Sequence, residues 1–200
     1  TYGARNQMPG TRMGNIALVR DTWIKAQAYK RKWDAYERKG GDMPARDLNM
    51  DTLRGVLAGE ILIQNHCYRA EEMAMMLDMA KEFGYKITSF HHATDAYKVA
   101  DLLRENGTCA SVWADWYGFK IESYDGIREN LALLEKAGAC ATIHSDDANG
   151  IQRLNQEVAK ALFAGRRAGI NISDEQAWTW LGINAARVLG INQRAGRLRP

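Results

Sequence analysis

The apolar positions near the start of the chain repeat with the spacing of an α-helix. They are Ile16, Val19, Trp23 and Ala26, and Trp33 and Tyr36 continue the same face. A period close to 3.6 residues places such side chains on one side of a helix, so the pattern predicts a long amphipathic helix from Gly14 to about Arg38. The stretch KGGDMPARD then breaks it. The segment 47–60 predicts a shorter helix with Asp47 or Asn49 near its start.

From residue 60 onward, short apolar runs alternate with amphipathic segments. The runs EILIQNH, KITSFHH, TCASVWADW and ACATIHSDD have the composition of β-strands, and each is followed by a predicted helix. Gly84 and Gly107 stand where a glycine commonly ends a helix. Four successive βα units predict a parallel sheet, because a crossover helix is needed to return the chain to a parallel neighbour. The strands lack apolar–polar alternation, which is typical of strands covered on both faces or lining a packed barrel.

Composition and charge narrow the classes of protein. The chain has 200 residues, of which 46% are hydrophobic and 26% are charged, as in an ordinary globular domain. The net charge is +3, and basic and acidic residues are interspersed, so nucleic acid and membrane surfaces are not indicated as partners. No segment approaches the roughly 20 apolar residues of a membrane span, and no signal peptide is recognisable.

The cysteines and the first residue bear on cellular location. Cys67, Cys109 and Cys140 are an odd number in apolar or strand-like contexts, which favours reduced, buried thiols in a cytoplasmic protein. The chain starts at Thr1 instead of methionine. We therefore expect that the true N-terminus, with any targeting signal, lies upstream.

Polar residues follow each predicted strand. They are His66 in the first unit, His91 and His92 in the second, Asp115 in the third and Asp146 in the fourth. His66 and His92 are 26 residues apart, and His92 and Asp146 are 54 apart, whereas one βα repeat of an eight-unit barrel takes roughly 25 to 30 residues. The spacing predicts that His66 and His92 lie on adjacent strands and Asp146 two strands further on, all at the C-terminal end of the sheet.

Two imidazoles and a carboxylate at one end of a sheet suit zinc and related divalent ions. A single histidine at a strand end is usually structural, but the trio at the repeat spacing favours a metal site formed by His66, His92 and Asp146. Asp146 has a further candidate role as the catalytic residue. A carboxylate beside a metal-bound water can take its proton and return it to the leaving group.

The motifs NHCYRAEEM, FHHATDAYK and IHSDDANGIQRLNQE resemble strands five, six and eight of the amidohydrolase superfamily, in particular its imidazolonepropionase-like and metal-dependent dipeptidase-like branch. The resemblance spans nearly the whole chain. It implies an α/β fold, the (β/α)₈ or TIM barrel, that hydrolyses amide or related C–N bonds with one or two divalent metals, Zn²⁺ or similar. It also implies that His66 and His92 are metal ligands, that Asp146 is the strand-eight aspartate, and that His91 supports the ligands.

The sequence also departs from that superfamily. Its members carry a His-x-His pair on strand one, and many carry a lysine on strand four, yet neither is found here. We therefore expect a partial barrel, with residues 1–60 as a helical segment after the missing strand four and residues 61–200 as strands five to eight. A half barrel leaves two strand edges unpaired, so we also expect it to be unstable alone or to form a homo-oligomer.

Several other residues have two interpretations each. Arg69 either binds a substrate carboxylate, beside Tyr68 over the same face, or forms a salt bridge with Glu72 or Asp95. His144 either supports the ligands or packs in the core. The remaining candidates are Trp113, Asp115 and Trp116, which either wall the pocket or pack against loops, and Asp147 and Asn149, which either lie near the site or cap the next helix.

The sequence thus favours a metal-dependent hydrolase with a small-molecule or dipeptide substrate. Two alternatives stay open. One is a deaminase of a nitrogen heterocycle, which the same scaffold supports. The other is a non-catalytic chain, either a truncated barrel or a binding module that lacks a complete site.

Overall fold

The structure is a computed structural model, and it describes residues 9–197. The chain divides into two compact units. The helical unit contains the residues up to Ile61 together with Met79–Lys86, and the sheet unit contains Leu62–Asp78 and the residues from Ile87 onward. None of the helices formed by residues 9–197 combines the length and apolar composition of a bilayer-spanning segment.

The helical unit is built on α1 (Arg12–Lys39) and α2 (Leu48–Leu57), which confirm the two predicted helices. Asp47 caps α2 by accepting hydrogen bonds from two backbone N–H groups of its first turn. Trp23 is 6% exposed and stacks on Tyr85 with ring centroids 4.1 Å apart. The apolar face expected of α1 therefore buries its central tryptophan within the unit.

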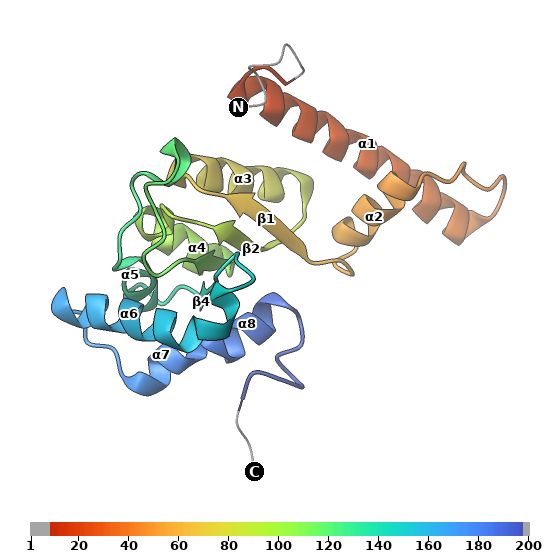
Figure 1. The fold of residues 1–200 in the computed structure, drawn as a ribbon. Coiled ribbons are helices and arrows are strands. Elements are labelled where there is room, and N and C mark those ends of the chain that lie inside the picture. Colours follow the sequence, from red (N-terminus) through yellow and green to blue (C-terminus); the bar gives the residue numbers. More distant parts are fainter. Residues whose placement is uncertain (1–8, 198–200) are drawn as a thin grey trace. The chain divides into compact units, whose positions relative to one another are not determined.

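The sheet unit has four parallel strands in the order β1-β2-β3-β4 (Figure 1). The strands are β1 (Ile63–Cys67), β2 (Ile87–His92), β3 (Cys109–Val112) and β4 (Ala141–Ile143). The helices that follow them are α3 (Ala70–Phe83), whose last turn belongs to the helical unit, α4 (Ala100–Asn106), α5 (Asn130–Lys136) and α6 (Leu154–Arg167). The predicted parallel sheet of four βα units is confirmed.

The sheet order explains where the connecting helices lie. Crossovers between parallel strands are right-handed, so a sheet whose neighbours follow chain order keeps its crossover helices on one face. A doubly wound sheet would instead reverse its order. Closure of this sheet into a barrel stays a prediction.

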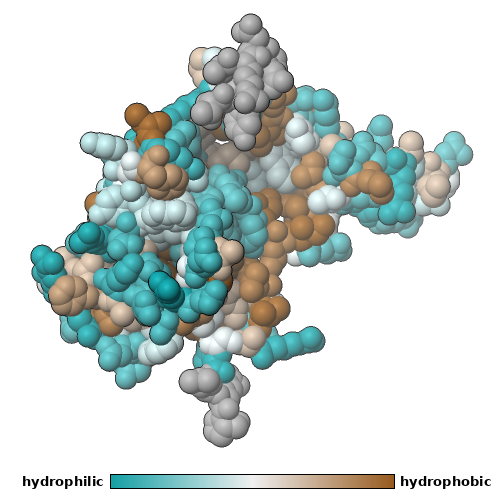
Figure 2. Space-filling model, in the orientation of Figure 1, coloured by the Kyte–Doolittle hydropathy of each residue, from teal (hydrophilic) through white to brown (hydrophobic). Residues whose placement is uncertain are grey.

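Two helices beyond α6 were not predicted from the sequence. They are α7 (Asp174–Leu181) and α8 (Ile183–Val188), and both contact β4. Ser173 and Gln176 form a capping box at the start of α7. Gly165 allows α6 to approach α5, because a Cβ there would collide with Ala132. In Figure 2 the surface of the sheet unit over α6 is mostly hydrophilic.

The expectation of three reduced cysteines is wrong. Cys109 and Cys140 form a disulfide between the N-terminal ends of β3 and β4, where the strand register brings their Cα atoms to 4.5 Å. Cys67 is free and buried. An odd number of cysteines is compatible with one bridge and one thiol, and the disulfide removes the cysteine argument for a cytoplasmic location.

Candidate functional site

Strand register places a row of polar side chains on one face of the sheet. Directly paired residues of parallel strands point to the same side. The pairs that share this face are Gln64 with Ser89, His66 with His91, His91 with Ser111, and Ser111 with Thr142. The opposite face carries mainly apolar residues, among them Phe90, Ala110, Val112 and Ile143.

The polar face contains a buried row of hydroxyl groups. Ser89 Oγ lies 3.1 Å from Ser111 Oγ, and Thr142 Oγ1 donates to Ser111 Oγ over 2.7 Å. All three residues are at most 3% exposed. Because buried hydroxyls need partners, these bonds satisfy one another and tie β2, β3 and β4 together below the histidines.

His92 joins the polar face through an unusual backbone conformation. Regular alternation would direct its side chain away from His91, but its φ is +66°, in the left-handed region that non-glycine residues rarely adopt. With this turn of the backbone, His92 Nε2 lies 2.7 Å from His66 Nδ1. The two imidazoles predicted to meet from adjacent strands are therefore in contact.

Asp146 reaches the same place from the loop after β4. Its φ is +51°, and its Oδ2 lies 3.8 Å from His92 Nδ1. His92 and Asp146 are the two non-glycine residues with positive φ in residues 9–197. Such strained conformations cluster at functional sites. The structure thus brings both His66 and Asp146 into contact with His92.

Aromatic rings enclose His92. The Tyr68 ring, after β1, and the Trp113 ring, after β3, both stack on His92, each with ring centroids 4.9 Å apart. Trp113 also stacks on His144 at 5.0 Å, and its Nε1 donates to Ser145 O over 3.1 Å. His92 is consequently 4% exposed.

Burial keeps the imidazoles of His92, His144 and His91 neutral. Burial lowers the pKa of His92 to about 4, against the opposing influence of Asp146. Burial also lowers the pKa of His144 to about 3 and that of His91 below its usual value. Neutral imidazole is the form that binds metals.

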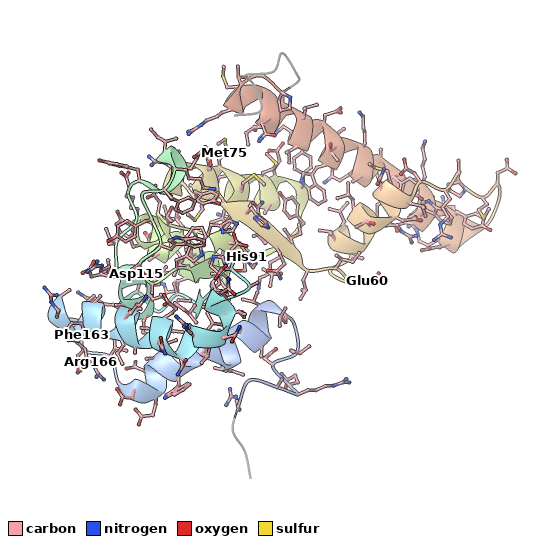
Figure 3. All side chains as sticks on the ribbon, in the orientation of Figure 1. Glu60, Met75, His91, Asp115, Phe163 and Arg166 are labelled. Atoms are coloured by element: carbon pink, nitrogen blue, oxygen red, sulfur yellow. A yellow bond between two sulfur atoms is a disulfide. The ribbon has the colours of Figure 1, made fainter. Side chains whose placement is uncertain are left out.

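The supporting histidines differ in their partners. His91 Nε2 lies 2.8 Å from Gln64 Oε1, so a hydrogen bond holds its ring at the end of β2, where Figure 3 shows it. His144 Nε2 and His92 Nδ1 are buried and have no hydrogen-bond partner among the described residues. Buried nitrogens without a partner are costly and call for an explanation by a ligand, water or ion.

The donor set fits a metal in its chemistry, since imidazole nitrogen and carboxylate oxygen are both zinc ligands. Within residues 9–197, however, no three histidine, cysteine, aspartate or glutamate side chains form a group arranged to hold an ion. His66 and His92 bond to each other, and Asp146 stands beside the unpaired Nδ1 of His92. The predicted donors therefore lie close together, and the metal site itself stays a prediction.

Arg69 is engaged by carboxylates. Its Nε lies 3.5 Å from both Glu71 Oε1 and Asp95 Oδ2, and its Nη1 lies 3.3 Å from Asp125 Oδ2. Asp95 is 1% exposed and also accepts from the backbone N–H of Ala70. The sequence indicates Asp95 only as a partner of Arg69, whereas its burial and its bond to Ala70 N–H make it a link between the loops after β1 and β2.

Tyr68 has a partner that the sequence did not reveal. Lys120 donates from Nζ to the Tyr68 hydroxyl over 2.6 Å and lies 4.0 Å from the ring centroid. Lys120 comes from the long loop between β3 and α5, and no signal in the sequence marks it among that loop's other charged residues. It adds a positive charge beside the ring that covers His92.

The other candidates except Asn149 line a cavity of about 210 Å³ next to His144. Its lining is Trp113, Asp115, Trp116, His144, Ser145, Asp147, Gly150, Glu157 and Lys160. Asp115 pairs with Lys160, with Oδ1 and Nζ 3.3 Å apart, so the structure does not join it to the histidines. Asp147 accepts a hydrogen bond from the backbone N–H of Gly150, as expected of a cap, whereas Asn149 makes no side-chain cap.

Comparison with known proteins adds two relatives. The chain is 26% identical over 211 residues to the amidohydrolase tasK of Hapsidospora irregularis, an alignment that covers 99% of the chain and 21% of that protein. It also matches the crystal structure of an amidohydrolase from Thermotoga maritima, with a TM-score of 0.85 and 29% identity. Both similarities support the amidohydrolase family.

The structural alignment with the Thermotoga maritima amidohydrolase covers 100% of this chain and 51% of that protein. The chain thus spans about half the length of the solved amidohydrolase and about a fifth of the curated one. No model of a known protein family matches it. The expected superfamily is therefore supported, while the imidazolonepropionase-like or dipeptidase-like branch stays a prediction.

Proposed function

We propose that this chain carries part of the active site of a metal-dependent hydrolase that acts on amide or other non-ester C–N bonds. The observation that carries the proposal is the contact of His92 with both His66 and Asp146, made through two positive-φ residues. The amidohydrolase relatives support the reaction class.

His66, His92 and Asp146 would hold the metal. The unpaired, buried Nδ1 of His92 is a nitrogen that such an ion would satisfy. When bound, a zinc or similar divalent ion would supply an activated water and polarise the scissile carbonyl. One or two ions are compatible with these donors.

Asp146 is the proposed proton carrier. The side chain is 56% exposed, so its carboxylate reaches both solvent and the substrate side of His92. Its Oδ2 would accept a proton from the attacking water and deliver it to the leaving nitrogen. Tyr68 and Trp113 would exclude bulk water from His92 and keep its imidazole neutral.

Tyr68 is proposed to contact the substrate, with Lys120 on its hydroxyl. Arg69 can act in two ways, as a clamp on a substrate carboxylate or as a positioning residue, and its ion pairs with Asp95 and Asp125 support the positioning role. Kinetics of Arg69→Ala separate the two. Equal loss on carboxylate-bearing and amidated substrates indicates positioning, and loss restricted to carboxylate-bearing substrates indicates a substrate contact.

We further propose that the sheet is part of a (β/α)₈ barrel and that the metal site takes additional donors from outside this chain. The sheet follows chain order, and its polar face bears the histidines, as the interior of a barrel would. Within the described residues, the three donors do not form a group arranged to hold an ion. The chain by itself should therefore bind zinc weakly and show little hydrolysis.

The test compares two proteins, the 200-residue chain and the same chain joined to a preceding barrel segment that carries a His-x-His pair. Both are assayed on dipeptides, N-acyl amino acids and cyclic amides, with zinc and after chelation. We expect metal-dependent turnover only in the joined protein. Robust turnover by the chain alone contradicts the shared site.

Two aspartate variants of the joined protein test the proton carrier. Asp146→Asn should remove most turnover and leave the fold intact, because the amide keeps the shape of the side chain but cannot accept the proton. Asp147→Asn is the matched control, since its side-chain oxygen can still accept from Gly150 N–H. Absence of hydrolysis in every protein, with zinc bound, would favour a non-catalytic chain.

A further inference from the structure

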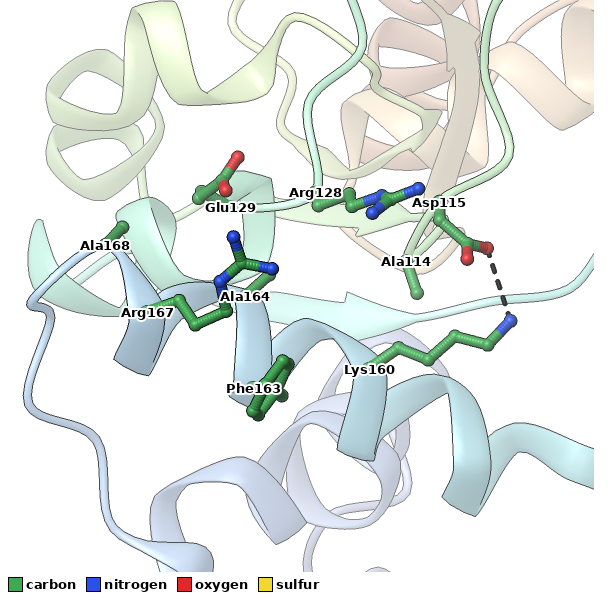
Figure 4. A pocket seen from close by; sticks show the side chains of 9 residues that line it. All are labelled: Ala114, Asp115, Arg128, Glu129, Lys160, Phe163, Ala164, Arg167 and Ala168. Carbon is green, nitrogen blue, oxygen red and sulfur yellow. Dashed lines mark hydrogen bonds and ion pairs between the residues drawn. The ribbon is translucent and has the colours of Figure 1, made fainter.

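A second cavity, of about 420 Å³, is larger than the one next to His144. It lies in the sheet unit between α6 and the loop segments that follow β3 and precede α5 (Figure 4). Its lining is Ala114, Asp115, Arg128, Glu129, Lys160, Phe163, Ala164, Arg167 and Ala168. This volume falls within the range of roughly 300–1,000 Å³ that is usual for small-molecule sites. None of His66, His92 and Asp146 lines it.

Two exposed arginines of this lining, Arg128 and Arg167, form no ion pair within residues 9–197. In Figure 4 the Arg167 guanidinium rises from α6 toward the loop that carries Arg128 and Glu129. Within the described part of the chain, neither guanidinium has a carboxylate within ion-pair distance. The contact that Arg167 does make is with the Phe163 ring, whose centroid lies 5.9 Å from its Cζ.

The other charges of the lining are arranged differently. Lys160 pairs with Asp115 at 3.3 Å and with Glu157 at 2.8 Å, so carboxylates already offset the lysine. Glu129 is the one lining carboxylate without such a pair among the described residues. The lining thus holds two guanidiniums and one carboxylate that form no ion pair among the described residues.

Guanidinium groups present a planar fork of N–H donors that matches the oxygens of a carboxylate or a phosphate. Phe163, Ala164 and Ala168 add an apolar surface beside that fork. We propose that this cavity binds a small organic anion, whose carboxylate or phosphate pairs with Arg128 and Arg167 while its apolar part lies against Phe163. The site is separate from the proposed hydrolytic centre and does not depend on its activity.

Isothermal titration of the purified protein with phenyl phosphate and with phenylacetate tests the site. At least one should bind, and the tighter of the two identifies phosphate or carboxylate as the preferred group. Arg128→Gln and Arg167→Gln should each weaken binding about tenfold, the loss expected for one charge-assisted pair. Glu129→Gln should strengthen it, because a like charge leaves the cavity.

Two controls separate the cavity from general charge attraction. Arg187→Gln removes an exposed arginine of α8 that does not line the cavity, and it should leave the affinity unchanged. Phe163→Ala should weaken phenyl phosphate more than inorganic phosphate, because only the former has an apolar part. Circular-dichroism melts verify folding, and Arg128→Lys and Arg167→Lys replace any glutamine variant that fails to fold.

Three results would overturn the proposal: no binding of either probe, full affinity in both arginine variants, or an equal loss in Arg187→Gln. Equal affinity for inorganic and phenyl phosphate would overturn the apolar part of the assignment.

Discussion

His92 Nε2 lies 2.7 Å from Nδ1 of His66, so imidazoles from two neighbouring parallel strands share one hydrogen bond. The contact exists because His92 ends β2 in a left-handed conformation, which returns its side chain to the face that carries His66. A positive φ costs a non-glycine residue of order 1–3 kcal/mol, and the surrounding packing must hold it.

Zinc binding should depend on this pair. We expect His66→Ala and His92→Ala to lower zinc affinity strongly, because each removes a proposed ligand. His91→Ala should cost less, on the order of tenfold, since His91 is bonded to Gln64 and would act only through its neighbours. Competition with a chromogenic chelator measures all three. An equal loss in His91→Ala and His92→Ala would contradict the assignment of ligands.

The row of buried hydroxyls should contribute to stability. Ser111→Ala removes the shared partner of Ser89 and Thr142 and leaves two buried hydroxyls with fewer bonds. The free energy of unfolding should fall by about 1–3 kcal/mol, measured by urea denaturation. Thr88→Val, on β2 but outside the row, is the control and should change it by less than about 0.5 kcal/mol. Equal effects would show that the row adds nothing.

Trp113 combines a hydrogen bond with stacking, and two substitutions separate them. Trp113→Phe loses the bond from Nε1 to Ser145 O but keeps a ring against His92 and His144, so it should cost about 1 kcal/mol. Trp113→Leu loses the stacking as well and should cost more. Chemical denaturation gives both values, and identical costs would mean that the ring contacts do not stabilise the site.

The Cys67 thiol should be unreactive in the folded protein. Burial raises the pKa of Cys67 to about 12, compared with about 8.5 for an exposed thiol. Alkylation by iodoacetamide at pH 8 should therefore be slow until the protein unfolds. Rapid alkylation of the native protein would contradict this burial.

The raised pKa of Cys67 also makes the free energy of unfolding depend on pH. An acid whose pKa is higher in the folded state favours that state fully below about pH 8.5, and the benefit is lost as pH rises toward 12. The Cys67→Ser variant should consequently lose less stability than the parent protein between pH 8 and pH 10. Urea denaturation at several pH values measures the difference, and parallel curves would refute it.

The helical unit has its own key contact. Trp23→Ala removes a ring that is 6% exposed and stacked on Tyr85, so it should lower the unfolding free energy by about 3–5 kcal/mol. Trp178→Ala, at a position 59% exposed, is the matched control and should cost little. If the two substitutions cost the same, the burial of Trp23 does not stabilise the unit.

The sequence predicted the features that depend on local periodicity. The helix α1 and the four βα units follow from apolar spacing, and the meeting of His66 with His92 follows from the length of one repeat. The helix α7 has a readable sequence signal in the capping box of Ser173 and Gln176, which lies outside the βα repeats.

Features that depend on tertiary contacts could not be predicted in the same way. The left-handed backbone of His92 and Asp146 has no local sequence signature, because other residues hold it. The Cys109–Cys140 bridge depends on the register of two strands, and Lys120 meets Tyr68 through a long loop of irregular structure. Such pairs become visible only when the sheet order and the loop paths are known.

The bridge between Cys109 and Cys140 has a topological consequence. The bridge joins residues 31 positions apart and so closes a covalent ring of chain. This ring contains β3, α5 and the loop that carries Trp113 and Lys120. A protease that cuts this exposed loop once would leave both pieces tethered at the base of the sheet. The nicked chain would migrate as one species until a reductant released the fragments, so the ring keeps β3 and β4 together even when the loop above them is broken.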